Sequence, residues 1–178
     1  MMQAVLDFWF SQLSPSDWYK KDEALDQKIS DLFLETYLQA TKGELYQWRE
    51  SIEGRLAEII VLDQFSRNIF RDDAMAFRYD SLALVLAQEA SSKPEAKALA
   101  STRKAFLYMP YMHSESLSVH DEAVRLFSEP GLENNLKFEL KHKEIIERFG
   151  RYPHRNKILG RTSTQDEIEF LKQPGSSF

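Results

Sequence analysis

Apolar side chains recur every three or four positions along most of the chain, which is the period of an amphipathic helix. Residues 20–41 carry one such stripe, and Gly43 follows it as a residue type that commonly ends helices. A second helix is expected over residues 52–70. Four consecutive apolar residues, 59–62, cover every side of that helix, so we expect it to be central and buried.

The same pattern predicts further helices separated by brief connections. Pro110 is expected to end one of them, because the residue before a proline disfavours helical backbone. Gly150 is expected to close a long helix, and Ser163 or Thr164 should open the last one through a capping box with the acid three residues later. The expected ranges are 4–10, 75–90, 94–109, 114–127 or 118–127, 132–149 and 163–172.

Turn-forming residues are scarce, since the 178-residue chain contains 6 glycines and 6 prolines. An all-β fold would need many more of them at its turns. Short connections favour helices that pack against their neighbours in sequence. We therefore predict an all-α fold of antiparallel helical hairpins, forming a single all-helical domain over residues 1–178.

The chain contains no cysteine, which excludes disulfides, thiolate metal sites and a cysteine nucleophile. This composition is typical of the reducing cytoplasm, and we predict a cytoplasmic location. The first residues lack the basic segment of a signal peptide, and Asp7 interrupts their apolar stretch. Because no run approaches 18 apolar residues, no membrane association is expected.

Charge is distributed unevenly along the chain. The net charge is -5, which argues against general binding to nucleic acid. Residues 141–161, however, contain seven lysines and arginines and two acidic residues, and so form a basic island on an acidic protein. Such an island predicts an anionic partner more specifically than the total charge does.

One candidate cluster lies on the helix predicted over residues 52–70. Asp63, Arg67 and Arg71 are four positions apart and therefore share one face. The aspartate and the first arginine can pair with each other, or with a partner such as Asp80 in the following helix. The cluster is either an ordinary set of ion pairs or a group of arginines pre-organised to face a ligand.

His113 and Glu115 follow the helix break expected at Pro110. They could ligate a metal or act together as an acid/base pair. Alternatively, Ser114 and Glu115 only stabilise the start of the next helix. His142 lies on an apolar stripe, which is typical of a hydrogen-bonded core histidine.

The most informative stretch reads RFGRYPHRN from residue 148, followed by GRTS from residue 160. A glycine ends the helix and a proline prevents its resumption, so Arg151, His154 and Arg155 are expected on a stiffened loop. Arginine binds carboxylate or phosphate through two parallel hydrogen bonds. Arg161 precedes a helix start, where backbone amides also favour an anion. Alternatively, these arginines cap helix ends and pair with acidic neighbours.

Established catalytic and cofactor signatures are missing from the sequence. It contains no HExxH, phosphate-binding loop, dinucleotide-binding glycine pattern or nucleophile-elbow serine. We therefore predict no resident metal or cofactor. A histidine/glutamate metal site is the alternative, because all four histidines fall in the second half of the chain.

Several of these segments together are similar to one known family. WYKKD (18–22), LDQFSRNIFR (62–71), AFRYD (76–80), FLYMPYMHSE (106–115) and RFGRYPHRNKILGRTST (148–164) resemble the bacterial domain-of-unknown-function family 924. The resemblance covers essentially the whole chain. It implies an all-helical fold similar to tetratricopeptide-like helical arrays, and it brings no activity with it.

The chain departs from the family pattern in two places. Ser66 stands where the pattern usually has proline, and Val119-His120 stands where it has Asp-Gln. No role is therefore assigned to residues 119–120. The positions that match as they stand are Asp63, Arg67, Arg71, Asp80, His113, Glu115, Arg148, Arg151, His154, Arg155, Asn156 and Arg161.

The leading hypothesis is a binding module with one concave pocket for an anionic small molecule or an acidic peptide, lined by Arg67, Arg71, Arg151, Arg155 and Arg161 together with His113 and His154. In this interpretation the ligand-binding residues are Asp63, Arg67, Arg71, Asp80, Arg148, Arg151, Arg155, Asn156 and Arg161.

Three alternatives remain. The chain could be a hydrolase in which His113 or His154 is the general acid/base, Glu115 orients it, and the arginines hold a phosphate or carboxylate. It could be a scaffold for a protein partner, which predicts an exposed apolar groove. RNA binding is a weaker alternative that needs an open basic stripe with exposed aromatic residues such as Tyr152.

Overall fold

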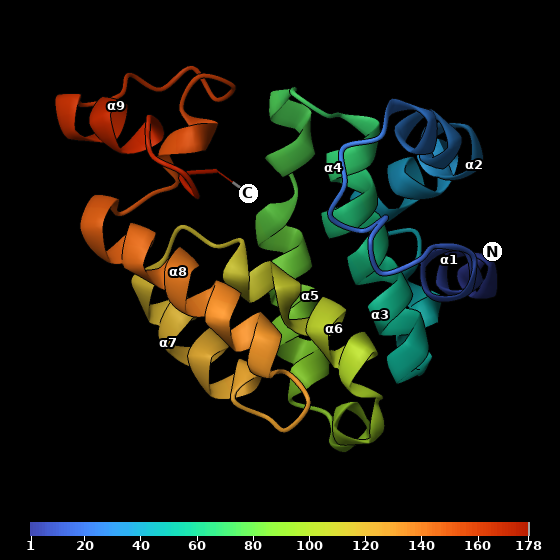
Figure 1. The fold of residues 1–178 in the computed structure, drawn as a ribbon. Coiled ribbons are helices and arrows are strands. Elements are labelled where there is room, and N and C mark those ends of the chain that lie inside the picture. Colours follow the sequence, from blue (N-terminus) through green and yellow to red (C-terminus); the bar gives the residue numbers. More distant parts are fainter. Residues whose placement is uncertain (178) are drawn as a thin grey trace. The chain divides into compact units, whose positions relative to one another are not determined.

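The computed structural model describes residues 1–177, which form helices and turns without a β-strand, as the all-α prediction requires (Figure 1). The chain packs as two compact units, residues 1–110 (unit 1) and residues 111–178 (unit 2). Each unit is described by itself below. The single domain expected over residues 1–178 stays a prediction, because two packing units can belong to one folding domain.

Unit 1 is built from the helices that precede Pro110, together with the first part of α6. Asp22 caps α2 by accepting hydrogen bonds from the amides of Ala24 and Leu25. Ser51 caps α3 through the amide of Gly54. The helices are α1 (Met2–Asp7), α2 (Glu23–Thr41), α3 (Ile52–Ile60), α4 (Ser66–Ile69), α5 (Asp80–Ser91) and α6 (Ser101–Met112).

The apolar run that was expected to be buried is the centre of unit 1. Ile59, Ile60, Val61 and Leu62 are each 0% exposed. Phe65 follows them and stacks on another buried ring, Phe33, with the ring centroids 4.7 Å apart. A helix segment that is apolar on every side can only be accommodated in this way.

The helix expected over residues 52–70 is interrupted. A π-helical turn, Val61–Phe65, separates α3 from α4. Both the apolar run and Phe65 are buried across this wider turn. The helix expected over residues 75–90 is also divided, because Asp73 caps a separate 3₁₀ turn and α5 begins only at Asp80.

The prediction that Pro110 ends a helix was wrong. α6 continues through it to Met112, and a 3₁₀ turn at Pro94–Ala98 lies before the helix instead of inside it. Proline lacks an N–H group and so removes one hydrogen bond near the end of a helix, where few bonds remain to be lost. The helix therefore ends three residues later than expected, and His113 follows its end directly.

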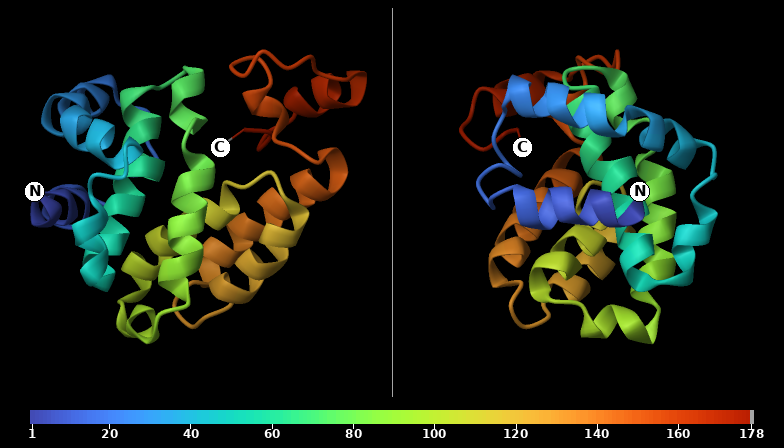
Figure 2. Two further views of the ribbon diagram at one scale, coloured as in Figure 1. Left: turned by 180° about the vertical axis from the view of Figure 1, so that it is seen from behind. Right: turned by 90° about the vertical axis from the view of Figure 1, so that its right-hand side faces the viewer.

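Unit 2 contains α7 (Leu117–Phe127), α8 (Glu133–Phe149) and α9 (Gln165–Leu171). The first two run side by side in all three ribbon views (Figures 1 and 2). Gly150 ends α8 in the left-handed conformation, with φ of 68°. The capping box at the start of α9 forms between Thr164 and Glu167, which is one of the two pairs expected.

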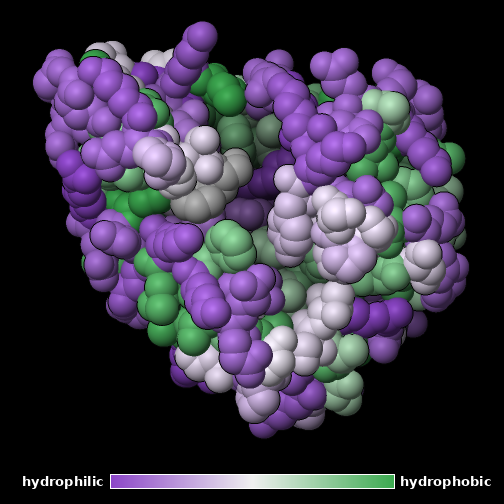
Figure 3. All heavy atoms as spheres, viewed as in Figure 1, coloured by the Kyte–Doolittle hydropathy of each residue, from purple (hydrophilic) through white to green (hydrophobic). Residues whose placement is uncertain are grey.

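On the face drawn in Figure 3, hydrophilic side chains cover most of the view, and hydrophobic ones occur in separate patches. Among residues 1–177, no helix combines the length and the hydrophobicity that a membrane span needs.

Candidate functional site

The residues predicted to form one pocket belong to both units. Of the twelve candidate site residues, Asp63, Arg67, Arg71 and Asp80 lie in unit 1, and the other eight lie in unit 2. Their convergence on a single pocket stays a prediction.

In unit 1, Arg67 lies between two carboxylates. Its guanidinium donates to Asp80 through two hydrogen bonds of 2.9 Å, and its Nη1 lies 3.2 Å from Asp63 Oδ1. The backbone carbonyl of Asp63 accepts another hydrogen bond from the same Nη1 at 2.8 Å. The pairing expected among these three residues is therefore present.

Arg71 has a partner that the sequence did not indicate. It donates two hydrogen bonds to Asp26, from Nε at 2.5 Å and from Nη2 at 2.7 Å, and Asn68 donates to the same carboxylate at 2.7 Å. These residues line a shallow polar hollow of about 300 Å³ in unit 1. Its other lining residues are Lys21, Glu23, Gln27, Ser30, Ile69 and Asp72.

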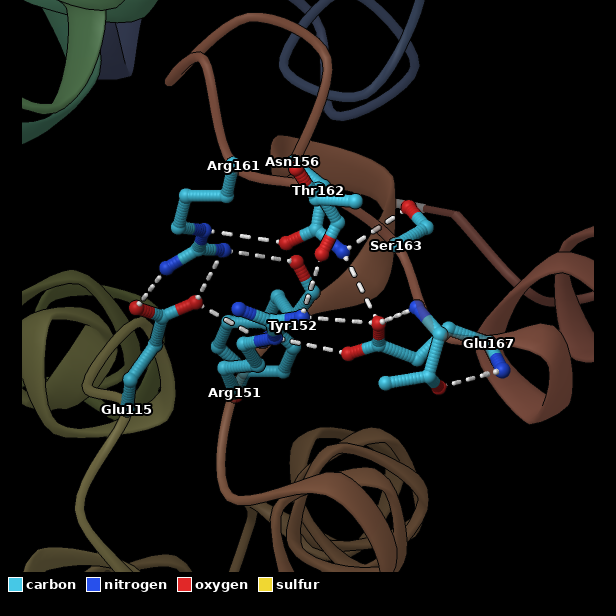
Figure 4. Close-up of polar contacts among 9 residues, drawn as sticks. Glu115, Arg151, Tyr152, Asn156, Arg161, Thr162, Ser163 and Glu167 are labelled. Atoms are coloured by element: carbon cyan, nitrogen blue, oxygen red, sulfur yellow. Dashed lines mark hydrogen bonds and ion pairs between the residues drawn. The ribbon is translucent and has the colours of Figure 1, made fainter.

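In unit 2, Glu115 and Arg161 form a bidentate pair, with Nη1–Oε2 at 2.7 Å and Nη2–Oε1 at 2.9 Å (Figure 4). The backbone N–H of Tyr152 also donates to Glu115, at 2.7 Å. Burial tends to raise the pKa of this carboxyl, but hydrogen bonds from Arg161 and Tyr152 outweigh burial and hold the pKa below its usual value. Glu115 is therefore a carboxylate that anchors the loop.

Arg151 forms a second bidentate pair, with Glu167, through hydrogen bonds of 2.7 and 2.8 Å. Glu167 is 2% exposed and also accepts the amide of Thr164 in the capping box. Hydrogen bonding to Arg151 lowers the pKa of Glu167 to about 2, with the Thr164 amide acting in the same direction.

Asn156 connects the two pairs, as Figure 4 shows. Its side-chain oxygen accepts from Arg161 Nε at 2.9 Å, and its Nδ2 lies 3.3 Å from Glu167 Oε2. The carbonyl of Tyr152 accepts from Arg161 Nη2 at 3.0 Å. These bonds hold residues 151–163 in one polar network, which accounts for the stiff loop expected from Gly150 and Pro153.

Two further arginines lie beside this network. Arg155 is 6% exposed, donates from Nη2 to the carbonyl of His113 at 3.0 Å, and lies over the ring of Tyr152. Arg148 is exposed, donates to Asp166 at 2.7 Å, and lies over the ring of Phe149 at 4.7 Å.

The buried ring of Tyr152 has histidines around it. His120, His142 and His154 have ring centroids within 6.3 Å of it. His142 is 6% exposed and hydrogen-bonds the carbonyl of Phe138, as expected for a core histidine. Burial lowers the pKa of His142 to about 3. No group of three or more potential ligands among residues 1–177 is arranged to hold a metal ion.

Sequence reasoning named the arginines but missed most of their partners. Asp26 carries no motif, and Asp166 and Glu167 were considered only as acids of a capping box. Glu139, which is 0% exposed and bound to His120, was not singled out at all. Its signal was its place on the buried face of α8, three residues before His142.

Comparison with known proteins places the chain among uncharacterised bacterial proteins. The family described as "Bacterial protein of unknown function (DUF924)" matches residues 5–175. A solved structure of a protein of unknown function from Agrobacterium tumefaciens has a similar fold, with a TM-score of 0.91 and 36% sequence identity over 96% of each chain. None of the curated proteins compared with this chain matches it.

Proposed function

This chain belongs to DUF924, a family of bacterial proteins of unknown function, and from its own residues we propose that it is a binding module for an anionic small molecule or an acidic peptide. The ligand group is a carboxylate or a phosphate. The site is the cationic loop, which we define as residues 148–161 of unit 2.

The main support for this proposal is the positive charge of the cationic loop. Residues 148–161 contain four arginines and one lysine and no acidic residue. Three carboxylates from other segments contact it and neutralise part of this charge, namely Glu115, Asp166 and Glu167. Arginine forks that already hold carboxylates in bidentate geometry have the shape and charge that an external carboxylate or phosphate requires.

Arg148 is the arginine most open to such a ligand. Its side chain is 46% exposed, and that of its partner Asp166 is 62% exposed. An ion pair this exposed is worth at most about 1 kcal/mol, so a ligand anion can compete for it. The rings of Phe149 and Phe170 lie beneath the guanidinium and restrict its rotation, which lowers the entropic cost of binding.

The test measures binding of two probes, citrate and inorganic phosphate, by thermal shift and calorimetry at constant ionic strength. Binding raises the melting temperature in proportion to RT ln(1 + [L]/Kd). We expect Arg148→Ala to weaken probe binding, because it removes the open fork. Asp166→Asn removes the internal competitor and should tighten binding by about two- to fivefold.

Arg125 provides a matched control. It is an exposed arginine on α7 of the same unit and is paired with Glu122, as Arg148 is with Asp166. Arg125→Ala should leave probe binding unchanged. If neither probe stabilises the protein, or if Arg125→Ala and Arg148→Ala have equal effects, the cationic loop is not an anion site.

Two other functions stay hypotheses. Hydrolysis would use His113 or His154 as the general acid/base, oriented by Glu115; all three residues are half-buried and lie in the same unit as the loop. A scaffold role would use exposed apolar side chains, such as Leu34 and Leu38 on α2. A protein that binds the probes but turns over no ester or phosphoester favours the binding module over the hydrolase.

A further inference from the structure

A histidine–glutamate pair is enclosed in the core of unit 2. His120 on α7 and Glu139 on α8 are both 0% exposed. The Nδ1 atom of the histidine lies 2.6 Å from Oε1 of the glutamate. Its Nε2 atom lies 2.8 Å from the carbonyl oxygen of Ser114 and 3.1 Å from the hydroxyl of Tyr152.

These contacts determine how many protons the pair holds. The carbonyl of Ser114 can only accept a hydrogen bond, so Nε2 of His120 carries a hydrogen. The short contact between Nδ1 and Oε1 requires one more hydrogen, on either atom. The pair therefore shares a single proton and has no net charge, whether it consists of imidazole and carboxylic acid or of imidazolium and carboxylate.

Losing that proton would be unfavourable in this environment. The second oxygen of Glu139, Oε2, is buried and has no hydrogen-bond partner among residues 1–177. Burial raises the pKa of Glu139, with the hydrogen bond to His120 acting in the opposite direction. Deprotonation would place a carboxylate against the lone pair of Nδ1, in a site enclosed by the core.

Tyr152 connects this pair to the cationic loop. Its hydroxyl donates to the carbonyl of Met112 at 2.5 Å, which leaves the hydroxyl oxygen to accept from His120. Its backbone N–H and carbonyl bind Glu115 and Arg161, and its ring lies beneath Arg155. Displacement of the Tyr152 ring would therefore disturb the network that holds the loop.

We propose that the His120–Glu139 pair is a pH-sensitive switch that keeps the cationic loop closed while it holds its proton and releases the loop when that proton is lost as the pH rises. The inference does not depend on anion binding, because it concerns the order of the loop itself. The titratable and charged groups that face the pair directly are Lys143 and His142 on α8 and Tyr152 on the loop. His113 and His154 act on His142, and Glu115 and Arg155 contact Tyr152.

The first test follows amide hydrogen exchange of residues 150–162 between about pH 6 and about pH 10, after correction for intrinsic exchange. In the unmodified chain we expect the loop amides to exchange about tenfold faster at the alkaline end. Glu139→Gln should remove this rise, because its amide donates to Nδ1 as the protonated acid does, and it cannot lose that hydrogen.

Glu144→Gln is the matched control, since Glu144 lies on the same helix and is exposed. It should behave like the unmodified chain. If Glu139→Gln shows the same alkaline rise, another group such as the Tyr152 hydroxyl opens the loop, and the proposal is overturned.

A second measurement uses the unmodified chain, and it tests the proposed switch even if Glu139→Gln fails to fold. The ¹⁵N chemical shifts of the His120 ring report whether Nδ1 shares a proton. They should change over the same pH range in which the loop begins to exchange. Constant ¹⁵N shifts across a range in which the loop opens, or a loop whose exchange ignores pH, would also overturn the proposal.

Discussion

Arg161 and Glu115 face each other through two hydrogen bonds although they are 46 positions apart in the chain. Their side chains are 24% and 26% exposed, so water only partly screens the pair. Glu115 also accepts the backbone N–H of Tyr152. One carboxylate thus ties the segment after α6 to two points of the cationic loop, Tyr152 and Arg161.

The coupling between these two residues can be measured with a double-mutant cycle of Glu115→Ala and Arg161→Ala. Each single change leaves a partly buried charge without its main partner and should cost about 2–3 kcal/mol of unfolding free energy. The double variant should cost less than the sum, with a coupling of about 1–2 kcal/mol. Urea denaturation provides the measurement.

Lys172 and Glu169 provide the control cycle, because both are exposed and form a pair within one turn of helix. Their coupling should stay below about 0.5 kcal/mol. Equal couplings in the two cycles would mean that the Arg161–Glu115 pair does not hold the loop.

Gly54 marks a close approach between backbones in unit 1. A Cβ atom built there lies 1.9 Å from the carbonyl oxygen of Trp48, so Gly54→Ala forces the backbone apart and should cost about 3 kcal/mol. At Gly43 an added Cβ atom has no neighbour within 4 Å, and only the backbone φ of 73° disfavours alanine. Gly43→Ala should therefore lower the unfolding free energy by about 1 kcal/mol. Thermal or urea unfolding that ranks the two variants in the opposite order would contradict this packing.

The lowered pKa of His142 predicts that the folded protein loses stability in mild acid. Its pKa is about 3 in the folded protein, against an ordinary value of 6.5, so the unfolded chain binds the proton more readily. The contribution of neutral His142 to the unfolding free energy is therefore fully present above pH 6.5 and is lost as the pH falls toward 3. His142→Gln should flatten this part of the stability profile, whereas Lys141→Gln, an exposed change one residue away, should leave the slope intact.

Glu167 affects the stability of the protein at lower pH than His142 does. Its pKa is lowered from 4.5 to about 2, so its contribution is present above pH 4.5 and is lost as the pH falls through 2. Glu167→Gln weakens both the Arg151 pair and the capping box, and should cost about 2 kcal/mol near pH 7. The difference from the unmodified chain should vanish near pH 2. Asp166→Asn, at the exposed neighbouring position, should change stability far less.

Local rules were sufficient for much of the helical structure. The all-α class, the central run 59–62, Gly150 as a helix end and the Thr164 capping box follow from periodicity and capping, which depend on neighbours within a few residues. The same rules failed at Pro110 and within residues 52–70, because packing tolerates a lost hydrogen bond or a wide turn where it buries more apolar surface.

The candidate site likewise has one part that the sequence determined and another part that only the tertiary structure decided. The sequence alone determined that arginines crowd into residues 148–161, where they follow a helix end and a proline. Only the tertiary structure decided which carboxylate each arginine meets, because Glu115 and Glu167 come from other segments, and a contact across 46 positions leaves no local pattern. The buried pair of His120 and Glu139 shows this most clearly. Only folding brings the two residues together and removes water from them, and this loss of water is what disfavours a charged form of the pair.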